Sequence, residues 1–444
     1  MTNIPSEWKN IDVILFDMDG VITSEEAYWD AAGLTIRELL ESPGFLGLNP
    51  TQYTPVVDLF YQRLSKSSRM EWRKYLPDKL IGACKSRGIN NNWDLTYLIA
   101  GIYLAPIFSP LFNYFSVAHD GSKGASTQSN DADAVKDMNR IDEALLQETI
   151  SPIWNRLLEL NSKGQQLDLL RTQDMHLWGD YFRTLGRNIV PINKPEKLIA
   201  EEIGLEARGL ELLNAINNLV IGDNKNRAPW FDRSSPLWHD CRALFQGWYL
   251  GEALYETTYQ EPLAYRPKPG LIHQEEPLLG RQATHKCLSQ LKEAGYTLGV
   301  ATGRPRNEIL TPLQRWEMLD YFGEGRISTH DEAEKAEAEL KSLGAHHQLS
   351  KPHPYIFLRA RYPEKSPLQL VEMTDAPPEE LKRTLIVGDA QADIWAAQKI
   401  HAPCAAVMTG AAGKADPQGL RDSKPDAIFD NVIDLTEQLI RLKK

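Results

Sequence analysis

Two aspartates follow an apolar run near the start of the chain, in the order Asp17-Met18-Asp19-Gly20. Gly20 permits a tight turn, so both carboxylates can face one crevice. Acids at this spacing can divide the work of group transfer. One attacks or binds a hard cation, and the other donates a proton to a leaving oxygen. The same four residues also make an ordinary turn, so this motif alone leaves both interpretations open.

A second polar motif, Thr302-Gly303-Arg304, ends a later apolar run. The Thr302 hydroxyl and the unhindered backbone N–H of Gly303 are suitable donors to a phosphoryl oxygen, and Arg304 is expected to add positive charge. A turn of this kind is common after a strand. It therefore has a purely structural interpretation as well.

Three more charged residues complete the set. Lys351 precedes Pro352 at a predicted helix start, where an ammonium group can neutralise charge on a transferring phosphoryl group. Asp389 and Asp393 are four residues apart after another apolar run. Asp389 is expected to reach Mg²⁺, and Asp393, one helical turn on, to orient Lys351 or waters of the metal. Each residue also has a purely structural interpretation: Lys351 as a solvated surface lysine, and Asp389 as a helix-capping residue.

The elements that must position these residues are short apolar runs, predicted as buried parallel strands at 11–16, 297–302, 384–389 and 402–408. Helical patterns separate the later strands, at 281–294, 304–319 and 331–344. Strands alternating with helices indicate an α/β fold with a Rossmann-like parallel sheet covered on both faces. Ligands of such sheets bind at the carboxyl ends of the strands, which is where the polar motifs lie.

Between the first strand and about residue 270, the apolar spacing is mostly three and four, which predicts a helical insert. We therefore expect three parts: 1–23 and 271–444 form the α/β core, and 24–270 forms the insert, in which 222–237 is a point of possible division. Eight of the eleven tryptophans lie in this insert, and filling a helical core is favoured over stacking on a substrate ring. The basic run 63–74 is interpreted as the solvated face of a helix rather than as a binding site for an anionic substrate.

Length and composition exclude several classes of protein. The 444 residues are enough for two or three domains, and 42% hydrophobic and 25% charged residues indicate a folded, water-soluble chain. The net charge of −11 disfavours nucleic acid and anionic lipid as partners. The N-terminus lacks an export-signal pattern, and the longest apolar stretch, 97–108, is too short to span a membrane. Four scattered cysteines without CxxC spacing fit a reducing cytoplasm, and the spacing of His346, His347 and His353 does not indicate zinc.

In chain order the motifs read VILFDMDGVI, LGVATGRP, SKPHPYIF and LIVGDAQADIWAAQ. Together they resemble the four motifs of the haloacid dehalogenase-like (HAD) hydrolase superfamily, specifically its phosphoglycolate phosphatase-like branch. The resemblance covers residues 8–29 and roughly 270–440. It implies a HAD-like core with a cap of the C1 type inserted after the first strand. The insert here is far larger than the usual small four-helix cap.

The resemblance also implies roles for individual residues. Asp17 looks like the nucleophile that forms an aspartyl-phosphate, and Asp19 like the general acid and base. Thr302, Gly303 and Lys351 look like the phosphate-binding residues. Mg²⁺ would be held by the Asp17 carboxylate, the Asp19 backbone carbonyl and Asp389, with Asp393 behind them. The dehalogenases of the family generally lack the second acid of the first motif, so Asp19 points to phosphate chemistry.

We therefore expect a cytoplasmic, Mg²⁺-dependent phosphatase that acts on a small phosphorylated metabolite, a phosphomonoester, without nucleic acid or membrane partners. Two other readings stay open. One is a phosphomutase or phosphonatase that uses the same nucleophile, and the other is a non-catalytic binding protein with the same fold. The sequence does not indicate the oligomeric state or the fold of the cap.

Overall fold

The computed structural model describes residues 4–42, 72–119, 207–215 and 233–443, apart from residues 86, 90, 210, 234, 265, 266 and 416. The chain divides into two compact units. The first comprises Met1–Tyr28, Tyr249–Glu261 and Gly270–Lys444, and the second comprises Trp29–Trp248 and Pro262–Pro269. Residues 249–261, which the helical spacing places in the expected insert, thus group with the first unit.

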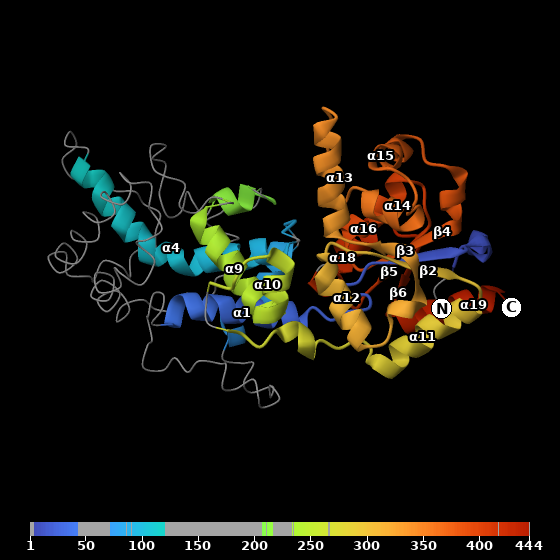
Figure 1. Cartoon of the computed structure of the whole chain (residues 1–444), viewed down its shortest axis with the longest axis horizontal. Coiled ribbons are helices and arrows are strands. Elements are labelled where there is room, and N and C mark those ends of the chain that lie inside the picture. The colour runs from blue at the N-terminus through green and yellow to red at the C-terminus, as the bar shows by residue number, and fades with distance from the viewer. Residues whose placement is uncertain are drawn as a thin grey trace. The chain divides into compact units, whose positions relative to one another are not determined.

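The first unit is built on a sheet of six parallel strands in the order β3-β2-β1-β4-β5-β6 (Figure 1). The strands are β1 (Val13–Phe16), β2 (Thr297–Ala301), β3 (Phe322–Ser328), β4 (Thr384–Gly388), β5 (Cys404–Val407) and β6 (Ala427–Phe429). Strand β1 lies between β2 and β4, where the direction of strand addition reverses. Such a switch point is the usual ligand-binding edge of an open α/β sheet.

Alternate side chains of each strand serve two cores, one on each face of the sheet. Ile14 and Phe16 of β1 pack with residues of η1, α11, α12 and α19, whereas Val13 and Leu15 pack with residues of α13, α14, α15 and α16. Figure 1 shows these two groups of helices on opposite sides of the strands. The apolar runs without alternation are explained by this burial on both faces, and the α/β prediction is confirmed.

The helices of the first unit follow the βα alternation. Their bounds are η1 (Ser6–Asn10), α10 (Glu252–Tyr259), η5 (Leu271–Gln274), α11 (Arg281–Glu293), α12 (Arg306–Arg315), η6 (Leu319–Tyr321), α13 (His330–Ser342), α14 (Tyr355–Arg361), α15 (Pro367–Asp375), η7 (Glu379–Arg383), α16 (Gln391–Lys399), α17 (Ala411–Ala415), α18 (Pro417–Asp422) and α19 (Val432–Lys443). The predicted helix at 304–319 begins two residues late, because Pro305 takes an extended backbone (ψ 154°) at the N-cap of α12, and it ends at Arg315, four residues early. Arg304 therefore lies in the turn before the helix.

The second unit is helical in the residues that the structure describes, with α1 (Glu26–Glu41), α3 (Asp78–Lys85), α4 (Asn92–His119) and α9 (Pro236–Leu250) contributing to it. Four of its tryptophans are buried, which supports their predicted role in a helical core; they are Trp29, Trp72, Trp238 and Trp248. Three of these donate their indole N–H to carboxylates. Trp93 is partly exposed, and Trp154, Trp178 and Trp230 lie outside the described residues.

The basic run 63–74 is described only from residue 72. Arg73 pairs with Asp30 at 2.8 Å and Lys74 with Glu41 at 2.9 Å, so both cations have partners within the second unit. Across the part of the chain that the structure describes, no helix combines the length and the apolar character that a membrane crossing requires.

Candidate active site

The polar motifs meet at the carboxyl ends of the three central strands. Phe16 pairs with Val300 of β2 on one side and with Val387 of β4 on the other. Asp17 is therefore in register with the last residues of both neighbouring strands, and its amide donates to the carbonyl of Val387 at 2.8 Å. Thr302 and Asp389 each lie just beyond the same edge. Residues far apart in the sequence are thus brought together by parallel pairing.

Lys351 links two of the acids. Its Nζ lies 2.8 Å from Oδ1 of Asp17 and 2.7 Å from Oδ1 of Asp393, and all three side chains are largely buried. The second oxygen of Asp393 accepts the amide of Ala390 at the start of α16. Asp393 thus contacts Lys351 through one oxygen and the start of α16 through the other, and its orienting role stays a prediction.

The electrostatics of this group are dominated by burial. Burial raises the pKa of Asp17 to about 7; Lys351 opposes this rise, while Asp393 and Asp19 add to it. Burial alone would lower the pKa of Lys351, but the carboxylates of Asp17 and Asp393 raise it above its ordinary value. The site therefore holds more negative than positive charge and favours an additional cation.

Asp17, Asp389 and Asp393 offer ligand oxygens that all lie within 4.8 Å of one another, and all three are buried. Among the described residues, this is the one such group of three or more His, Cys, Asp or Glu side chains. The donors are all carboxylate oxygens, the hard ligands that Mg²⁺ prefers. These residues fit the predicted metal, and the contribution of the Asp19 backbone carbonyl stays a prediction.

Two glycines surround the carboxylate of Asp389. A Cβ on Gly410 would come within 1.6 Å of Oδ2 of Asp389, and one on Gly20 within 2.5 Å of the same atom. Gly20 also has a positive φ of 71°, a conformation that glycine adopts without strain. The hydroxyl of Thr409 donates to the carbonyl of Gly20, which ties the loop after β5 to the first motif. Gly410 was not predicted as a site residue, because its position after a predicted strand is the only signal that the sequence carries for it.

We expect Gly410→Ala to displace Asp389 and weaken metal binding about tenfold or more, because the methyl group and the carboxylate cannot share one volume. Gly413→Ala is the matched control, since its Cβ would meet only the side chain of Leu420 at 3.3 Å and other atoms at 3.6 Å or more. Isothermal titration with Mg²⁺ measures the difference. Equal Mg²⁺ affinity in Gly410→Ala and the wild type would contradict the expectation that the position of Asp389 depends on the absence of a side chain at Gly410.

Thr302 and Gly303 lie in the turn after β2. Thr302 is fully buried, donates its amide to the carbonyl of Ser328 at 3.0 Å, and accepts the amide of Arg304 on its hydroxyl at 3.2 Å. Gly303 is exposed, and no other atom lies within 4 Å of the place where a Cβ would sit. Its backbone thus faces open space at the ligand-binding edge. The phosphate-binding role of both residues stays a prediction.

Asp19 is less buried than Asp17, with a quarter of its side chain exposed. Its Oδ1 accepts hydrogen bonds from the hydroxyl of Thr23 at 3.1 Å and from Nε and Nη2 of Arg304 at 3.0 and 2.5 Å. All of these donors reach Oδ1, so Oδ2 is the oxygen that a substrate can meet. The expectation that Arg304 adds charge for a phosphoryl oxygen is not supported, because its guanidinium is directed at this acid instead.

His353 lies two residues after Lys351, and its Nδ1 accepts the amide of Tyr355 at 3.2 Å at the start of α14. Burial, with smaller contributions from Lys399 and His347, lowers the pKa of His353 to about 4. The imidazole of His353 therefore binds a proton near pH 6.5 in the unfolded chain but only near pH 4 in the folded chain. The neutral form is required for the hydrogen bond, because a protonated Nδ1 cannot accept.

We expect the free energy of unfolding of the wild type to fall by about 1 to 3 kcal/mol between pH 6.5 and pH 4 because of His353. Asn retains a side-chain acceptor without titrating, so His353→Asn should lose less stability over this range. Urea unfolding at several pH values measures both. Parallel curves for the two proteins would contradict the assignment.

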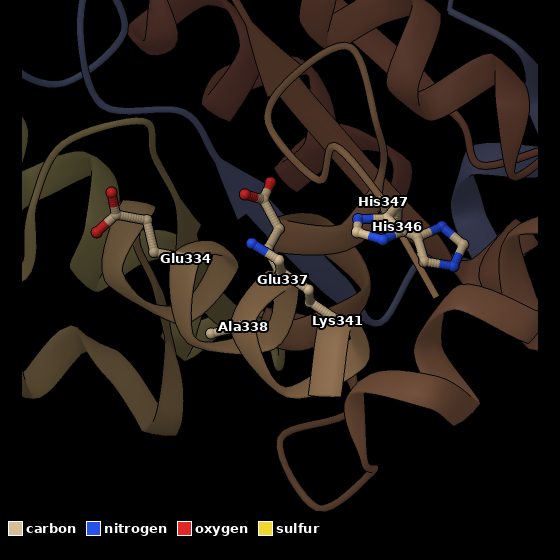
Figure 2. A pocket seen from close by; sticks show the side chains of 6 residues that line it. All are labelled: Glu334, Glu337, Ala338, Lys341, His346 and His347. Carbon is tan, nitrogen blue, oxygen red and sulfur yellow. The ribbon is translucent and has the colours of Figure 1, made fainter. Parts of the chain in front are cut away.

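His346 and His347 contribute to a pocket of their own. They line a pocket of about 330 Å³ with residues of α13, namely Glu334, Glu337, Ala338 and Lys341 (Figure 2). The two glutamates already have protein partners. Glu334 lies 3.2 Å from His330, and Glu337 accepts the amide of Leu349.

Comparisons with known proteins agree with this architecture. The family model described as HAD-hydrolase-like matches residues 348–435. Pyrophosphatase PpaX of Bacillus mycoides is 28% identical over 171 residues, which is 38% of this chain and 64% of that protein. PpaX of Bacillus cereus is 28% identical over 204 residues, or 44% of this chain and 79% of that protein. The chain thus spans somewhat less than two thirds of the first of these relatives.

An X-ray structure solved as a target of the Northeast Structural Genomics Consortium is similar in fold. It superposes with a TM-score of 0.70, covering 97% of this chain and 99% of the other at 24% identity. This coverage is larger than that of the PpaX matches, which span less than half of this chain. With the motifs in register at one edge of a parallel sheet, the first unit has a HAD-like hydrolase fold, and its residues 348–435 match the HAD-hydrolase-like family.

Proposed function

We propose that this protein is a Mg²⁺-dependent phosphatase that hydrolyses a small phosphomonoester through an aspartyl-phosphate on Asp17. The observation that carries the proposal is the buried group of Asp17, Lys351 and Asp393, with lysine to carboxylate distances of 2.8 and 2.7 Å, beside Asp389. A nucleophile, a fixed cation and an all-oxygen metal site at one strand edge are the parts that phosphoryl transfer needs.

In the first half-reaction, an oxygen of Asp17 attacks phosphorus while the bond from phosphorus to the ester oxygen breaks. Oδ2 of Asp19 gives its proton to the departing alcohol. Lys351, together with the amide of Gly303 and the hydroxyl of Thr302, neutralises charge on the phosphoryl oxygens. A bound Mg²⁺, held by Asp17 and Asp389, would reduce the repulsion between the carboxylate and the phosphate.

In the second half-reaction, water attacks phosphorus and gives a proton to Asp19, and Asp17 departs as a carboxylate. The second acid therefore acts once as acid and once as base. It is suited to both tasks because it is partly exposed, whereas Asp17 is buried.

The relatives named pyrophosphatase support a phosphoric anhydride as the second candidate substrate. The same nucleophile also serves a phosphomutase or a phosphonatase. A panel of phosphomonoesters, phosphonates and pyrophosphate with Mg²⁺ separates these activities by their products. Free phosphate and alcohol support the proposal, a rearranged ester indicates a mutase, and a borohydride-trapped imine indicates a phosphonatase. No turnover of any compound would favour a non-catalytic binding protein.

A further inference from the structure

The guanidinium of Arg304 is buried, and each of its three nitrogens donates a hydrogen bond to the protein. Its side chain is 1% exposed. Nε and Nη2 donate to Asp19, and Nη2 also donates to Thr23 at 3.1 Å. Nη1 lies 3.0 Å from Oε2 of Glu275 and 3.3 Å from the carbonyl of Glu308. The whole donor fork of the guanidinium is engaged by the protein.

Two stacked tyrosines complete the surroundings of this arginine. Nη1 also donates to the hydroxyl of Tyr249 at 3.0 Å, and the ring of Tyr28 lies 4.6 Å from the guanidinium carbon. The two rings stack at 4.3 Å, and the Tyr249 hydroxyl donates in turn to Glu275. Glu275 is buried as well, so it supplies the negative charge that keeps the arginine in place independently of Asp19.

This geometry decides between two roles for Arg304. A phosphate-binding arginine needs free N–H donors facing the substrate. Here the donors meet two carboxylates, two hydroxyls and a backbone carbonyl, and the side chain is closed off from solvent. Arg304 can therefore affect the reaction only indirectly, through its hydrogen bonds to Oδ1 of Asp19.

We infer that Arg304 is a positioning residue that fixes Oδ1 of Asp19 and thereby presents Oδ2 to the leaving oxygen. The inference rests on the proposed function, in which Asp19 transfers the proton. A guanidinium that is itself held by Glu275 and Tyr249 leaves the Asp19 carboxylate little rotational freedom. Proton transfer requires alignment within a few tenths of an ångström, so loosening this residue slows the step that needs the acid.

The test compares two substrates that differ in their need for an acid. An alkyl phosphomonoester such as β-glycerophosphate needs a proton on its leaving oxygen, whereas 4-nitrophenyl phosphate releases a stable anion. We expect Arg304→Gln to lower kcat for the alkyl ester about 100-fold and for the aryl ester less than about tenfold, with KM nearly unchanged for both. Arg306→Gln is the matched control. Arg306 is 41% exposed, pairs with Glu332 and should retain both activities.

A double-mutant cycle tests whether the effect passes through Asp19. In an Asp19→Asn background, Arg304→Gln should cause no further loss on the alkyl ester beyond about threefold, since the acid is already absent. Tyr249→Phe removes one of the hydrogen bonds to Arg304 and should give a smaller loss with the same preference for the aryl ester. It also provides a second variant should Arg304→Gln not fold.

Three results would overturn the inference: equal losses on both substrates, a raised KM at unchanged kcat, or additive losses with Asp19→Asn. Failure of the proposed function is recognised separately, by Asp17→Asn retaining turnover. A crystal structure of Arg304→Gln, or of Tyr249→Phe, decides the matter even without turnover. A displaced Asp19 carboxylate supports the inference, and an unmoved one contradicts it.

Discussion

Asp17→Asn should abolish hydrolysis and at the same time stabilise the metal-free protein. We expect kcat to fall about 10⁴-fold or more, because an amide oxygen cannot form the acyl phosphate. Asn occupies the same volume, and its oxygen can still accept from Lys351. Phosphate release from the substrates identified in the panel measures the first effect.

The stabilising effect follows from the raised pKa of Asp17. Its value rises from 3.8 to about 7 on folding, so the folded chain holds a proton that the unfolded chain has released. Stability due to this group is therefore lost as the pH rises from about 4 to about 7. At pH 8 in EDTA, Asp17→Asn should be more stable than the wild type by about 2 kcal/mol, and Mg²⁺ should reduce this gain. Normal turnover, or a variant that is less stable in EDTA, would contradict the assignment.

Lys351→Gln is expected to have the opposite effect on stability. Without the ammonium group, the buried carboxylates of Asp17 and Asp393 face each other without a counter-charge. Removing one partner of a buried ion pair typically costs about 3 kcal/mol, and removing a cation that stabilises transferred charge lowers kcat about 10³-fold. Mg²⁺ should restore part of the stability but not the rate.

The control for this substitution is Lys382→Gln. Lys382 is 61% exposed and pairs with Glu379 on the surface, so Lys382→Gln should leave the free energy of unfolding and kcat nearly unchanged. Thermal unfolding with and without Mg²⁺, together with steady-state kinetics, measures both variants. A Lys351→Gln protein with wild-type kcat would remove Lys351 from the proposed mechanism.

The strands around the site were predictable because they are buried on both faces. β1, β2, β4 and β5 are continuous apolar runs, and each was expected within three residues of its observed bounds. β3 was missed because its sequence, Phe322–Ser328, contains two glycines, Glu324 and Arg326, and it lies at the edge of the sheet with β2 as its neighbour. β6 was missed because three residues carry too little pattern.

Some of the candidate site residues could also be predicted from the sequence, and others could not. The positions that follow a strand or precede a helix were predictable, because parallel pairing brings them together; they are Asp17, Lys351, Asp389 and Asp393. The residues that contact these side chains were not predictable. The contact of Arg304 with Glu275 and Tyr249 depends on the tertiary path of residues 249–275, and no local spacing encodes it. The space beside Gly410 depends on where Asp389 points, which the sequence does not specify either.

The proposed mechanism requires that an oxygen of Asp17 becomes bonded to phosphorus. Crystals grown with Mg²⁺ and beryllofluoride provide the decisive test, because beryllofluoride mimics a phosphoryl group on a carboxylate. Beryllium is expected to be bonded to an oxygen of Asp17, with its fluorides facing Lys351 and the turn at Gly303. Beryllofluoride bonded to another residue, or an Asp17 side chain turned away from an empty cleft, would contradict it.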